Sequence, residues 1–368
     1  MHASFGMLLS GANGFLGCHL LWELQQKGVP RIKCLIRADG HLQARVRLEH
    51  ALQAYQLELC FDTLEVIAVD LSKPDLGLSE QERGDLMVGV DCIVHAAACV
   101  NFTASVEQMI RTNVDATQAL LRLAQAANVS RFVYISSLAV VNGLEWPARM
   151  PVPEAPLPLS QGKALSYYAS TKMAAEQFCL AAASSALEMT VLRLPYLLAA
   201  ASSLAINRHG YFDLILAAVL QLGGSFEETF DLHALPVDCC AAWVVRVALA
   251  TAVPPVMHVL HNTPMPWSEW LNSARAMGLA ITMEPMDQWY VRLRQAAARS
   301  RHRGLLAAIA FLKLDATHKR WIQMNAHRLR FENRNLCAVV SDATAPLRLS
   351  MAYKHAVLQR LLADEVSK

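Results

Sequence analysis

The stretch SGANGFLG, residues 10–17, determines how the rest of this sequence is interpreted. An apolar run over residues 5–9 precedes it and an amphipathic run over residues 15–27 follows it, which predicts a strand, a glycine turn and a helix. Glycines at positions 11, 14 and 17 keep side chains off the turn, so an anion can approach the backbone N–H groups where the helix begins. The spacing favours a site for the pyrophosphate of a dinucleotide; a turn that merely joins strand to helix is the alternative.

Length and composition are typical of a folded protein with a small net charge. The sequence has 368 residues, of which 54% are hydrophobic, enough for roughly two domains with buried cores. A formal net charge of +2 gives no argument for a nucleic-acid partner. No apolar run reaches the roughly 18 residues of a membrane span, and the first strand begins too early to leave room for a targeting peptide. We therefore expect a cytoplasmic protein with no membrane span.

The cysteines and histidines show no pattern typical of a metal site. The nine cysteines lack metal-ligand spacing, so we expect reduced thiols. His258 and His261 flank two apolar residues and have no further ligands nearby, which indicates that they bind no metal.

Strand-like apolar runs alternate with helical patterns through residues 1–200. After the glycine turn, strands are predicted over residues 31–37, 64–71, 90–98, 131–140 and 189–198, the last of them broken by Pro195. Helices are predicted over residues 41–56, 105–127 and 167–183. This alternation predicts an α/β fold with a Rossmann-type, doubly wound parallel sheet, whose ligands bind beyond the carboxyl ends of the strands. Residues 1–200, with strands from about 230–262, would form the dinucleotide-binding domain. Residues 201–368 would form a smaller, mostly helical substrate domain.

Arg37 ends the second predicted strand, at the position that decides cofactor choice. An acidic side chain there would accept hydrogen bonds from the adenine ribose and select NAD. A guanidinium suits a 2′-phosphate instead, so the sequence predicts NADPH, although Asp39 lies close by. Arg45 and Arg47 on the next helix are candidates for a second phosphate contact. A solvated strand end is the alternative explanation of Arg37.

Further cofactor contacts are expected where the other predicted strands end, because small or polar side chains there let a dinucleotide pass close to the backbone. These candidates are Asp70, Leu71, Ala96, Ala97, Ala98, Ser136, Pro195, Tyr196 and Leu197, together with Asn113 on the helix after the fourth strand.

Ser137, Tyr168 and Lys172 are the candidate catalytic residues. Tyr168 and Lys172 are four apart at the start of a predicted helix, so they share one face of it. An ammonium near the phenol would lower the pKa of Tyr168. The phenol could then give a proton to an oxygen that gains charge on hydride transfer, and a serine hydroxyl would complete the site for that oxygen. A tyrosine and a lysine at this spacing are common by chance, but here they follow the glycine turn and a strand that ends in two serines.

Basic side chains dominate residues 291–334, where eleven arginines and lysines face only Asp315 and Glu332. A solvated basic face is the ordinary explanation. The alternative is a docking surface for an acidic partner.

The chain resembles the extended short-chain dehydrogenase/reductases, and among them the thioester reductase family. This family comprises terminal reductase domains of nonribosomal peptide and polyketide synthases, carboxylic acid reductases and fatty acyl-CoA reductases. The segments that carry the resemblance include MLLSGANGFLGCHLLWEL, IKCLIRA, VIAVDLSKPDLGLSEQE, VDCIVHAAACVNF, YISSLAV and YYASTKMAAE.

The resemblance implies that NADPH reduces an acyl thioester on a carrier protein to an aldehyde and a free thiol, in some members on to the alcohol. Ser137, Tyr168 and Lys172 would match the catalytic residues, Arg37 the 2′-phosphate contact, and Asp70 with Leu71 the adenine contact. The pyrophosphate turn would be formed by Gly11, Asn13, Gly14, Phe15, Leu16 and Gly17.

Two departures and one absence qualify the resemblance. Asn13 replaces a usual threonine, and Leu194-Pro195-Tyr196 replaces a usual Arg-Pro-Gly at the nicotinamide end. The sequence contains no carrier domain, so an acidic acyl or peptidyl carrier would have to dock in trans, for which the basic residues 291–334 are the candidate surface.

Two other functions compete with thioester reduction. One is an extended short-chain dehydrogenase or epimerase that acts on a sterol-like alcohol or a nucleotide sugar, against which the LSKPDLGLSEQE segment argues. The other is a catalytically silent NADP-binding scaffold, against which the intact Ser137, Tyr168 and Lys172 argue.

Overall fold

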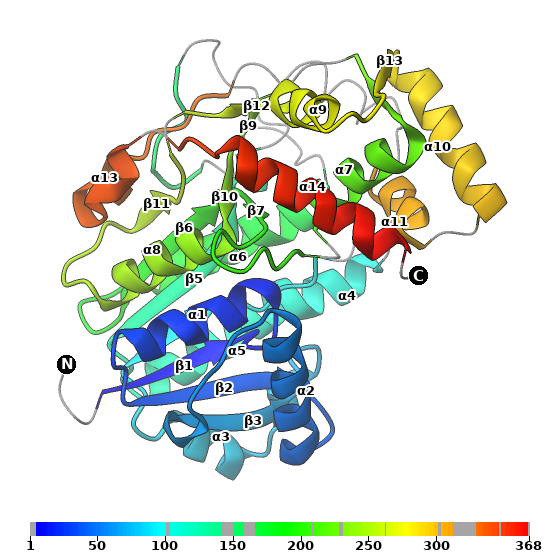
Figure 1. Cartoon of the computed structure of the whole chain (residues 1–368). Coiled ribbons are helices and arrows are strands. Elements are labelled where there is room, and N and C mark those ends of the chain that lie inside the picture. Colours follow the sequence, from blue (N-terminus) through cyan, green and yellow to red (C-terminus); the bar gives the residue numbers. More distant parts are fainter. Residues whose placement is uncertain are drawn as a thin grey trace.

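The centre of the protein is a seven-stranded parallel sheet in the order β11-β6-β5-β4-β1-β2-β3 (Figure 1). The computed structural model describes residues 5–100, 104–141, 150–157, 166–207, 210–227, 231–261, 263–300, 303–312, 329–345 and 347–366. The strands of this sheet are β1 (Gly6–Ser10), β2 (Arg31–Arg37), β3 (Leu64–Val69), β4 (Cys92–His95), β5 (Arg131–Ser137), β6 (Glu188–Leu194) and β11 (Val256–His258). This arrangement confirms the predicted α/β fold with a doubly wound sheet.

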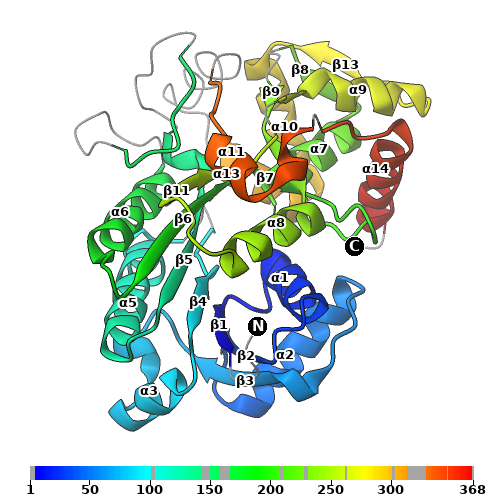
Figure 2. The same ribbon diagram turned by 90° about the vertical axis from the view of Figure 1, so that its left-hand side faces the viewer.

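Helices cover both faces of the sheet, as Figure 2 shows. One face packs against α1 (Phe15–Gln26), α2 (His41–Ala54) and α8 (Val237–Leu249), and the other against α3 (Glu80–Met87), α5 (Ala116–Ala126) and α6 (Tyr167–Ala182). Alternate residues of each strand enter the two hydrophobic layers on either side of the sheet, which together form the first core. Met7 and Leu9 face one layer, whereas Leu8 faces the other. The strands are therefore apolar on both faces, as buried parallel strands are.

A second hydrophobic core lies beyond the sheet and is built mainly by the C-terminal half of the chain. Its helices are α7 (Tyr211–Leu222), α9 (Trp267–Ala276), α10 (Met286–Ser300), α11 (Arg303–Leu312) and α14 (Met351–Val366). Short strands accompany them: β7 (Tyr196–Leu198), β8 (Gly224–Phe226), β9 (Asp231–Leu232), β10 (Ala234–Pro236), β12 (Met265–Pro266) and β13 (Thr282–Glu284).

Tryptophans fill this second core. Trp267, Trp270 and Trp289 are buried, Phe226 stacks on Trp267, and the indole of Trp289 donates a hydrogen bond to the Gly224 carbonyl at 2.7 Å. The chain also returns to the first core, because α8, β11 and α13 (Arg334–Val339) contribute residues to the sheet or to its hydrophobic layer. The two halves of the sequence are thus interleaved.

The structure differs locally from the sequence prediction in two places. The segment after β3 contains α3, which begins at a capping box formed by Ser79 and Glu82. The predicted helix over residues 105–127 is divided into α4 (Val106–Ile110) and α5 by a π-helical turn, Arg111–Asp115. The predicted break at Pro195, which has no backbone N–H to donate, is confirmed, because β6 ends before it and β7 begins after it. Residues 142–164 contain five prolines, and of this region residues 142–149 and 158–164 lie outside the described ranges.

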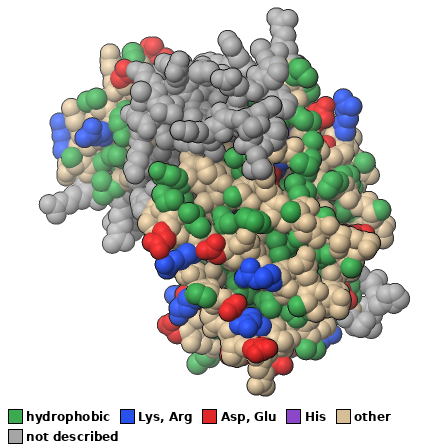
Figure 3. Space-filling view, turned by 180° about the vertical axis from the view of Figure 1, so that it is seen from behind, with side chains coloured by type: hydrophobic (Ala, Val, Ile, Leu, Met, Phe, Trp, Pro, Cys, Tyr) green, Lys and Arg blue, Asp and Glu red, His purple; other side chains and the backbone are tan. Residues whose placement is uncertain are grey.

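Within the described ranges, no helix is both long and apolar enough to cross a membrane. On the face opposite that of Figure 1, the described surface carries acidic and basic side chains side by side in its lower half (Figure 3). This mixture agrees with the small net charge of the sequence.

Candidate active site

The glycine turn brings α1 against the ends of β1 and β4. Gly11 has φ +74°, and a Cβ there would lie 2.8 Å from the Ala97 Cα; a Cβ on Gly17 would lie 2.0 Å from the Gly11 carbonyl oxygen. Both positions therefore require glycine. Among the described residues, no side chain caps the N-terminus of α1, and its first turn holds no acidic side chain. The backbone N–H groups of this turn can therefore bind an anion, so the turn fits the pyrophosphate of a dinucleotide.

A buried chain of hydrogen bonds supports the floor of this turn. The Ala97 N–H donates to Ser10 Oγ at 3.1 Å, and Ser10 Oγ lies 2.6 Å from His95 Nδ1. His95 Nε2 lies 3.0 Å from Thr117 Oγ1, whose own proton goes to the Asn113 carbonyl. These directions fix His95 as the neutral Nε2–H tautomer. Burial, with a smaller effect of Lys172, lowers the pKa of His95 to about 3, so the ring stays neutral.

Asn113 joins the loop after β4 to helix α6. Its Oδ1 accepts from the Cys99 N–H at 2.7 Å, and its Nδ2 donates to the Cys99 carbonyl and to Thr171 Oγ1. The π-helical turn that contains Asn113 is the kind of insertion often found at functional sites. The Asn113 amide is occupied by protein groups and the residue is 1% exposed, so its side chain connects the loop after β4 to α6 in the buried interior.

The three candidate catalytic residues lie where α6 packs against the end of β5. A hydrogen bond joins the side chains of Tyr168 and Ser137. Ser137 Oγ also accepts the Ala139 N–H at 3.1 Å, which leaves its proton for a second partner. The Lys172 ammonium is buried, donates to the Ile135 carbonyl at 2.6 Å and lies 4.5 Å from the ring centre of Tyr134. The structure thus brings together the three residues that the sequence singled out.

The acid–base properties of this cluster differ from the expectation in one respect. Burial raises the pKa of Tyr168 to about 12, partly opposed by the hydrogen bond with Ser137, so the expected lowering by Lys172 is not observed. Lys172 instead donates to the Ile135 carbonyl. Burial lowers the pKa of Lys172 to about 8, and Cys179 and Glu176 oppose that effect. At neutral pH both the phenol and the ammonium therefore hold their protons.

Arg37 and Arg47 lie together at the carboxyl end of β2. Both side chains are exposed, and the Arg47 guanidinium donates to the Arg37 carbonyl. Partial burial alone would raise the pKa of Asp70, but hydrogen bonds from Ser72 and the positive charges of Lys73 and Arg37 lower it overall. The ends of β2 and β3 thus present exposed positive charge next to a carboxylate.

The other end of the site is formed where β6 continues into β7. Tyr196 in β7 pairs with Ala234 in β10, and its backbone N–H donates to the His233 carbonyl at 3.0 Å. The Tyr196 side chain packs against the second core, whereas Leu197 packs against the first. Pro195 and Tyr196 therefore stand at the junction of the two cores.

Two further groups of predicted residues have the following surroundings. Ser136 is buried, and its hydroxyl donates to Glu176 at 2.5 Å. Of the basic residues 291–334, Arg294 and Arg299 are exposed on α10, while Arg292 pairs with Glu284. Residues 301, 302 and 313–328 of that region lie outside the described part of the chain.

Sequence reasoning missed the buried ion pair between Glu176 and Arg193, in which Arg193 Nη2 and Glu176 Oε2 are 2.8 Å apart. Two signals were available. Arg193 stands at the centre of an apolar strand, and Glu176 lies four residues after Lys172 on the same helical face.

Comparisons with known proteins agree with this geometry. The family model described as male sterility protein, an NAD-binding family, matches residues 9–244. A linear gramicidin synthase of Brevibacillus parabrevis is 27% identical over 293 residues, which cover 79% of this chain and 6% of the synthase. The chain therefore spans well under two thirds of that relative.

Two solved structures share the fold. The terminal R domain from the myxalamid PKS-NRPS biosynthetic pathway has a TM-score of 0.87 and 25% identity, covering 98% of this chain and 91% of that domain. A thiolation-reductase di-domain from an archaeal non-ribosomal peptide synthetase has a TM-score of 0.76 and 19% identity, covering 99% of this chain and 76% of the di-domain.

Proposed function

Because this chain belongs to the male sterility protein family of NAD(P)-dependent reductases, we propose that it reduces an acyl thioester to an aldehyde and a free thiol. The observation that carries the proposal is the cluster of Ser137, Tyr168 and Lys172 at the carboxyl edge of the sheet. The glycine turn, which follows β1, lies at the same edge. The terminal reductase domains among its structural relatives support the same reaction class.

The proposed reaction begins at the thioester carbonyl, which would lie within reach of Ser137 and Tyr168. Reduced nicotinamide supplies the hydride to the carbonyl carbon. Tyr168 donates its proton to the carbonyl oxygen, and Ser137 donates a hydrogen bond to the same oxygen, so the developing charge is neutralised. The resulting hemithioacetal breaks its carbon–sulfur bond, the hydroxyl proton leaves, and the sulfur is released as a thiol. Tyr168 regains its proton from the solvent, so one thioester, one reduced cofactor and one proton give one aldehyde, one thiol and one oxidised cofactor.

Lys172 would have two tasks in this site. Its ammonium is positioned by the Ile135 carbonyl and is protonated at neutral pH, so it can bind the ribose hydroxyls of the nicotinamide nucleotide. Its positive charge also favours negative charge that develops on the phenol during proton transfer.

NADPH is the proposed cofactor. Arg37 and Arg47 have exposed guanidinium groups at the carboxyl end of β2, the first strand after the glycine turn. Guanidinium groups bind phosphate oxygens in a bidentate manner, so they suit the 2′-phosphate that distinguishes NADPH from NADH.

An acidic carrier protein in trans is the proposed source of the thioester. Arg294 and Arg299 are exposed on α10, a helix whose buried face packs in the second core. Tyr196 packs against the same core where β6 continues into β7. Opposite charges on the two surfaces would steer their encounter and fix their relative orientation.

The proposed activity is tested by supplying NADPH with a medium-chain acyl thioester of N-acetylcysteamine. We expect the absorbance of reduced nicotinamide to fall while thiol and aldehyde, or alcohol, appear. One thiol should be released per acyl group, with one NADPH consumed for an aldehyde and two for an alcohol. NADPH oxidation without thiol release would contradict thioester reduction.

Replacing Tyr168 by phenylalanine removes the proton donor and leaves the ring. Turnover should fall roughly 10²–10⁴-fold, while NADPH affinity, measured by fluorescence titration, should change little. Tyr167→Phe is the matched control, because Tyr167 is the adjacent tyrosine and its side chain is 64% exposed. A Tyr168→Phe enzyme as fast as the control would show that the phenol is not the acid.

Replacing Arg37 by alanine should weaken NADPH binding about tenfold or more, as expected for the loss of charge-assisted hydrogen bonds, and leave NADH binding nearly unchanged. Dissociation constants for both cofactors give the comparison. Arg31→Ala, at the opposite end of β2, serves as the control. Equal losses for the two cofactors would rule out the 2′-phosphate role.

Reversing charge with Arg294→Glu and Arg299→Glu should raise KM for a carrier-bound substrate about tenfold and leave KM for a small thioester unchanged. Lys27→Glu with Arg122→Glu makes the same change of charge at exposed positions, directly after α1 and on α5. If the two double variants behave alike with the carrier, α10 is not the docking surface.

A further inference from the structure

Three consecutive residues of β5 are held by three residues of α6 that are spaced one helical turn apart. The Ile135 carbonyl accepts from Lys172, Ser136 Oγ donates to Glu176 Oε1 at 2.5 Å, and Ser137 bonds to Tyr168. Positions 168, 172 and 176 share one face of the helix. Two of these contacts involve candidate catalytic side chains, and the third involves Glu176, to which the proposed reaction assigns no task.

Glu176 is buried at 1% exposure and paired with a cation from a third element. Arg193 of β6 is fully buried and donates through Nε and Nη2 to the two carboxylate oxygens at 2.8–3.2 Å. Its Nη2 also reaches the Ala155 carbonyl at 3.1 Å. A carboxylate in such a position is costly to bury unless charge and hydrogen bonds compensate it, and here both do.

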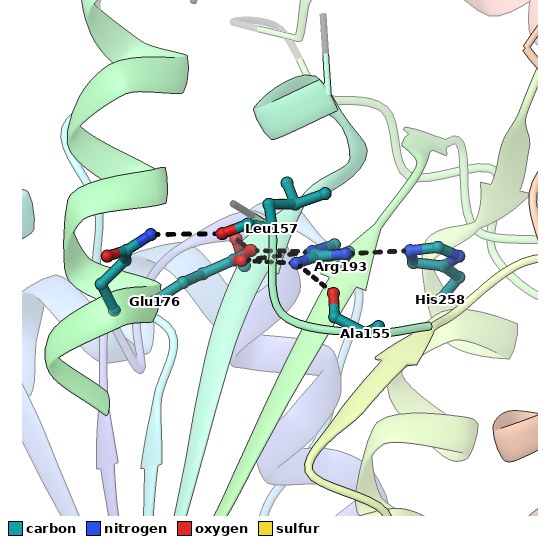
Figure 4. A network of polar contacts seen from close by, with 7 residues as sticks. Ala155, Leu157, Glu176, Arg193 and His258 are labelled. Atoms are coloured by element: carbon teal, nitrogen blue, oxygen red, sulfur yellow. Dashed lines mark hydrogen bonds and ion pairs between the residues drawn. The ribbon is translucent and has the colours of Figure 1, made fainter. Parts of the chain in front are cut away.

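The network continues to the C-terminal part of the chain through His258, as Figure 4 shows. His258 Nδ1 lies 2.8 Å from the Glu332 carbonyl, so Nδ1 must be the donor. Nε2 is then an acceptor, and Arg193 Nη1 donates to it at 3.2 Å. Burial, followed by the Arg193 charge, lowers the pKa of His258 to about 3, which keeps it neutral. The network therefore has one consistent direction from Arg193 to the Glu332 carbonyl.

We propose that Glu176 is a positioning residue, which fixes the end of β5 relative to α6 and provides the negative charge nearest in sequence to Lys172 on that helix. The proposal rests on the reductase function proposed above. Through Ser136, Glu176 fixes the adjacent Ser137, and with it the oxygen site that Ser137 and Tyr168 share. Through its charge it favours the protonated form of Lys172.

The electrostatic part of the proposal depends on every charged or titratable group around Lys172. These groups are Tyr168, Glu176 and Cys179 on α6, Tyr134 on β5, His95 on β4 and, through its pair with Glu176, Arg193 on β6. His95 is neutral, and burial keeps the phenols and the thiol protonated. Glu176 is thus the anion of the group, although the Arg193 charge offsets part of its effect.

The first test replaces Glu176 by glutamine, which keeps the volume and one acceptor oxygen and removes the charge. Burial lowers the pKa of Lys172 to about 8, and this effect is opposed by Cys179 and, after it, by the Glu176 charge. Without that charge the pKa should fall further, so the loss of turnover at alkaline pH should begin at a lower pH than in the parent enzyme. The same shift should be visible without substrate, by NMR titration of the lysine side chain in protein labelled with ¹³C at the lysine ε-carbons, with the Lys172 signal assigned from a Lys172→Arg variant.

The second test, Ser136→Ala, leaves the Glu176–Arg193 pair intact and removes the hydroxyl contact. We expect kcat to fall about tenfold or more, because small displacements of reacting groups are costly, while KM for NADPH and the Lys172 titration stay unchanged. Thr190→Val is the matched control: Thr190 is a fully buried β6 residue whose hydroxyl has no partner among the described residues.

The outcomes separate this proposal from the proposed function. If the parent enzyme reduces no thioester but Lys172 titrates lower in Glu176→Gln, the charge role stands and the reductase function fails. If the Lys172 titration is the same in both proteins, or if Ser136→Ala keeps the kcat of Thr190→Val, Glu176 has a structural role only and the proposal is wrong. Should Glu176→Gln fail to fold, Ser136→Ala still decides the positioning role.

Discussion

The parallel direction of all seven strands is the constraint on which the site depends. Because the strands run the same way, the ends of β1, β4, β5 and β6 meet at one edge of the sheet. The glycine turn can reach that edge only because Gly17 lies against the Gly11 carbonyl and Gly11 against Ala97, without side chains between them. Close approach of α1 therefore places helix N–H groups at the same edge as the hydroxyls of Ser137 and Tyr168.

Buried charge is concentrated next to this edge, and its arrangement explains why it is tolerated. Lys172, Glu176 and Arg193 are each at most 2% exposed, and each has charged or carbonyl partners within hydrogen-bonding distance. Such groups contribute little net stability compared with apolar side chains of the same size, but removal of one partner is strongly destabilising. Their effect is to allow one relative position of β5, β6 and α6. A site that must place an oxygen between two hydroxyls depends on that restriction.

Sequence patterns predicted the features that depend on neighbours along the chain. The strand over residues 31–37 has the predicted bounds, because an apolar segment lies between two turns, and the spacing of Tyr168 and Lys172 follows from helical periodicity alone. Features set by tertiary contacts were missed or assigned differently. Pro74 and Gly77, which are typical of a turn, obscured the capping box of α3. The π-helical turn at Asn113 adds one residue to the helix without altering the composition. Ser136 turns inward to Glu176, forty positions away along the chain. The roles of the cofactor and catalytic candidates remain predictions.

The raised pKa of Tyr168 bears on the direction in which such a site works. Oxidation of an alcohol needs a base, and a phenol with a pKa of about 12 is rarely deprotonated at neutral pH. Reduction needs an acid, and the alkoxide that hydride addition creates is basic enough to take a proton from such a phenol. Burial, which raises the pKa of Tyr168, therefore makes this phenol a proton donor rather than a base at neutral pH, as the proposed reduction requires. In that reaction Lys172, protonated below a pKa of about 8, would stabilise the phenolate that remains after proton transfer.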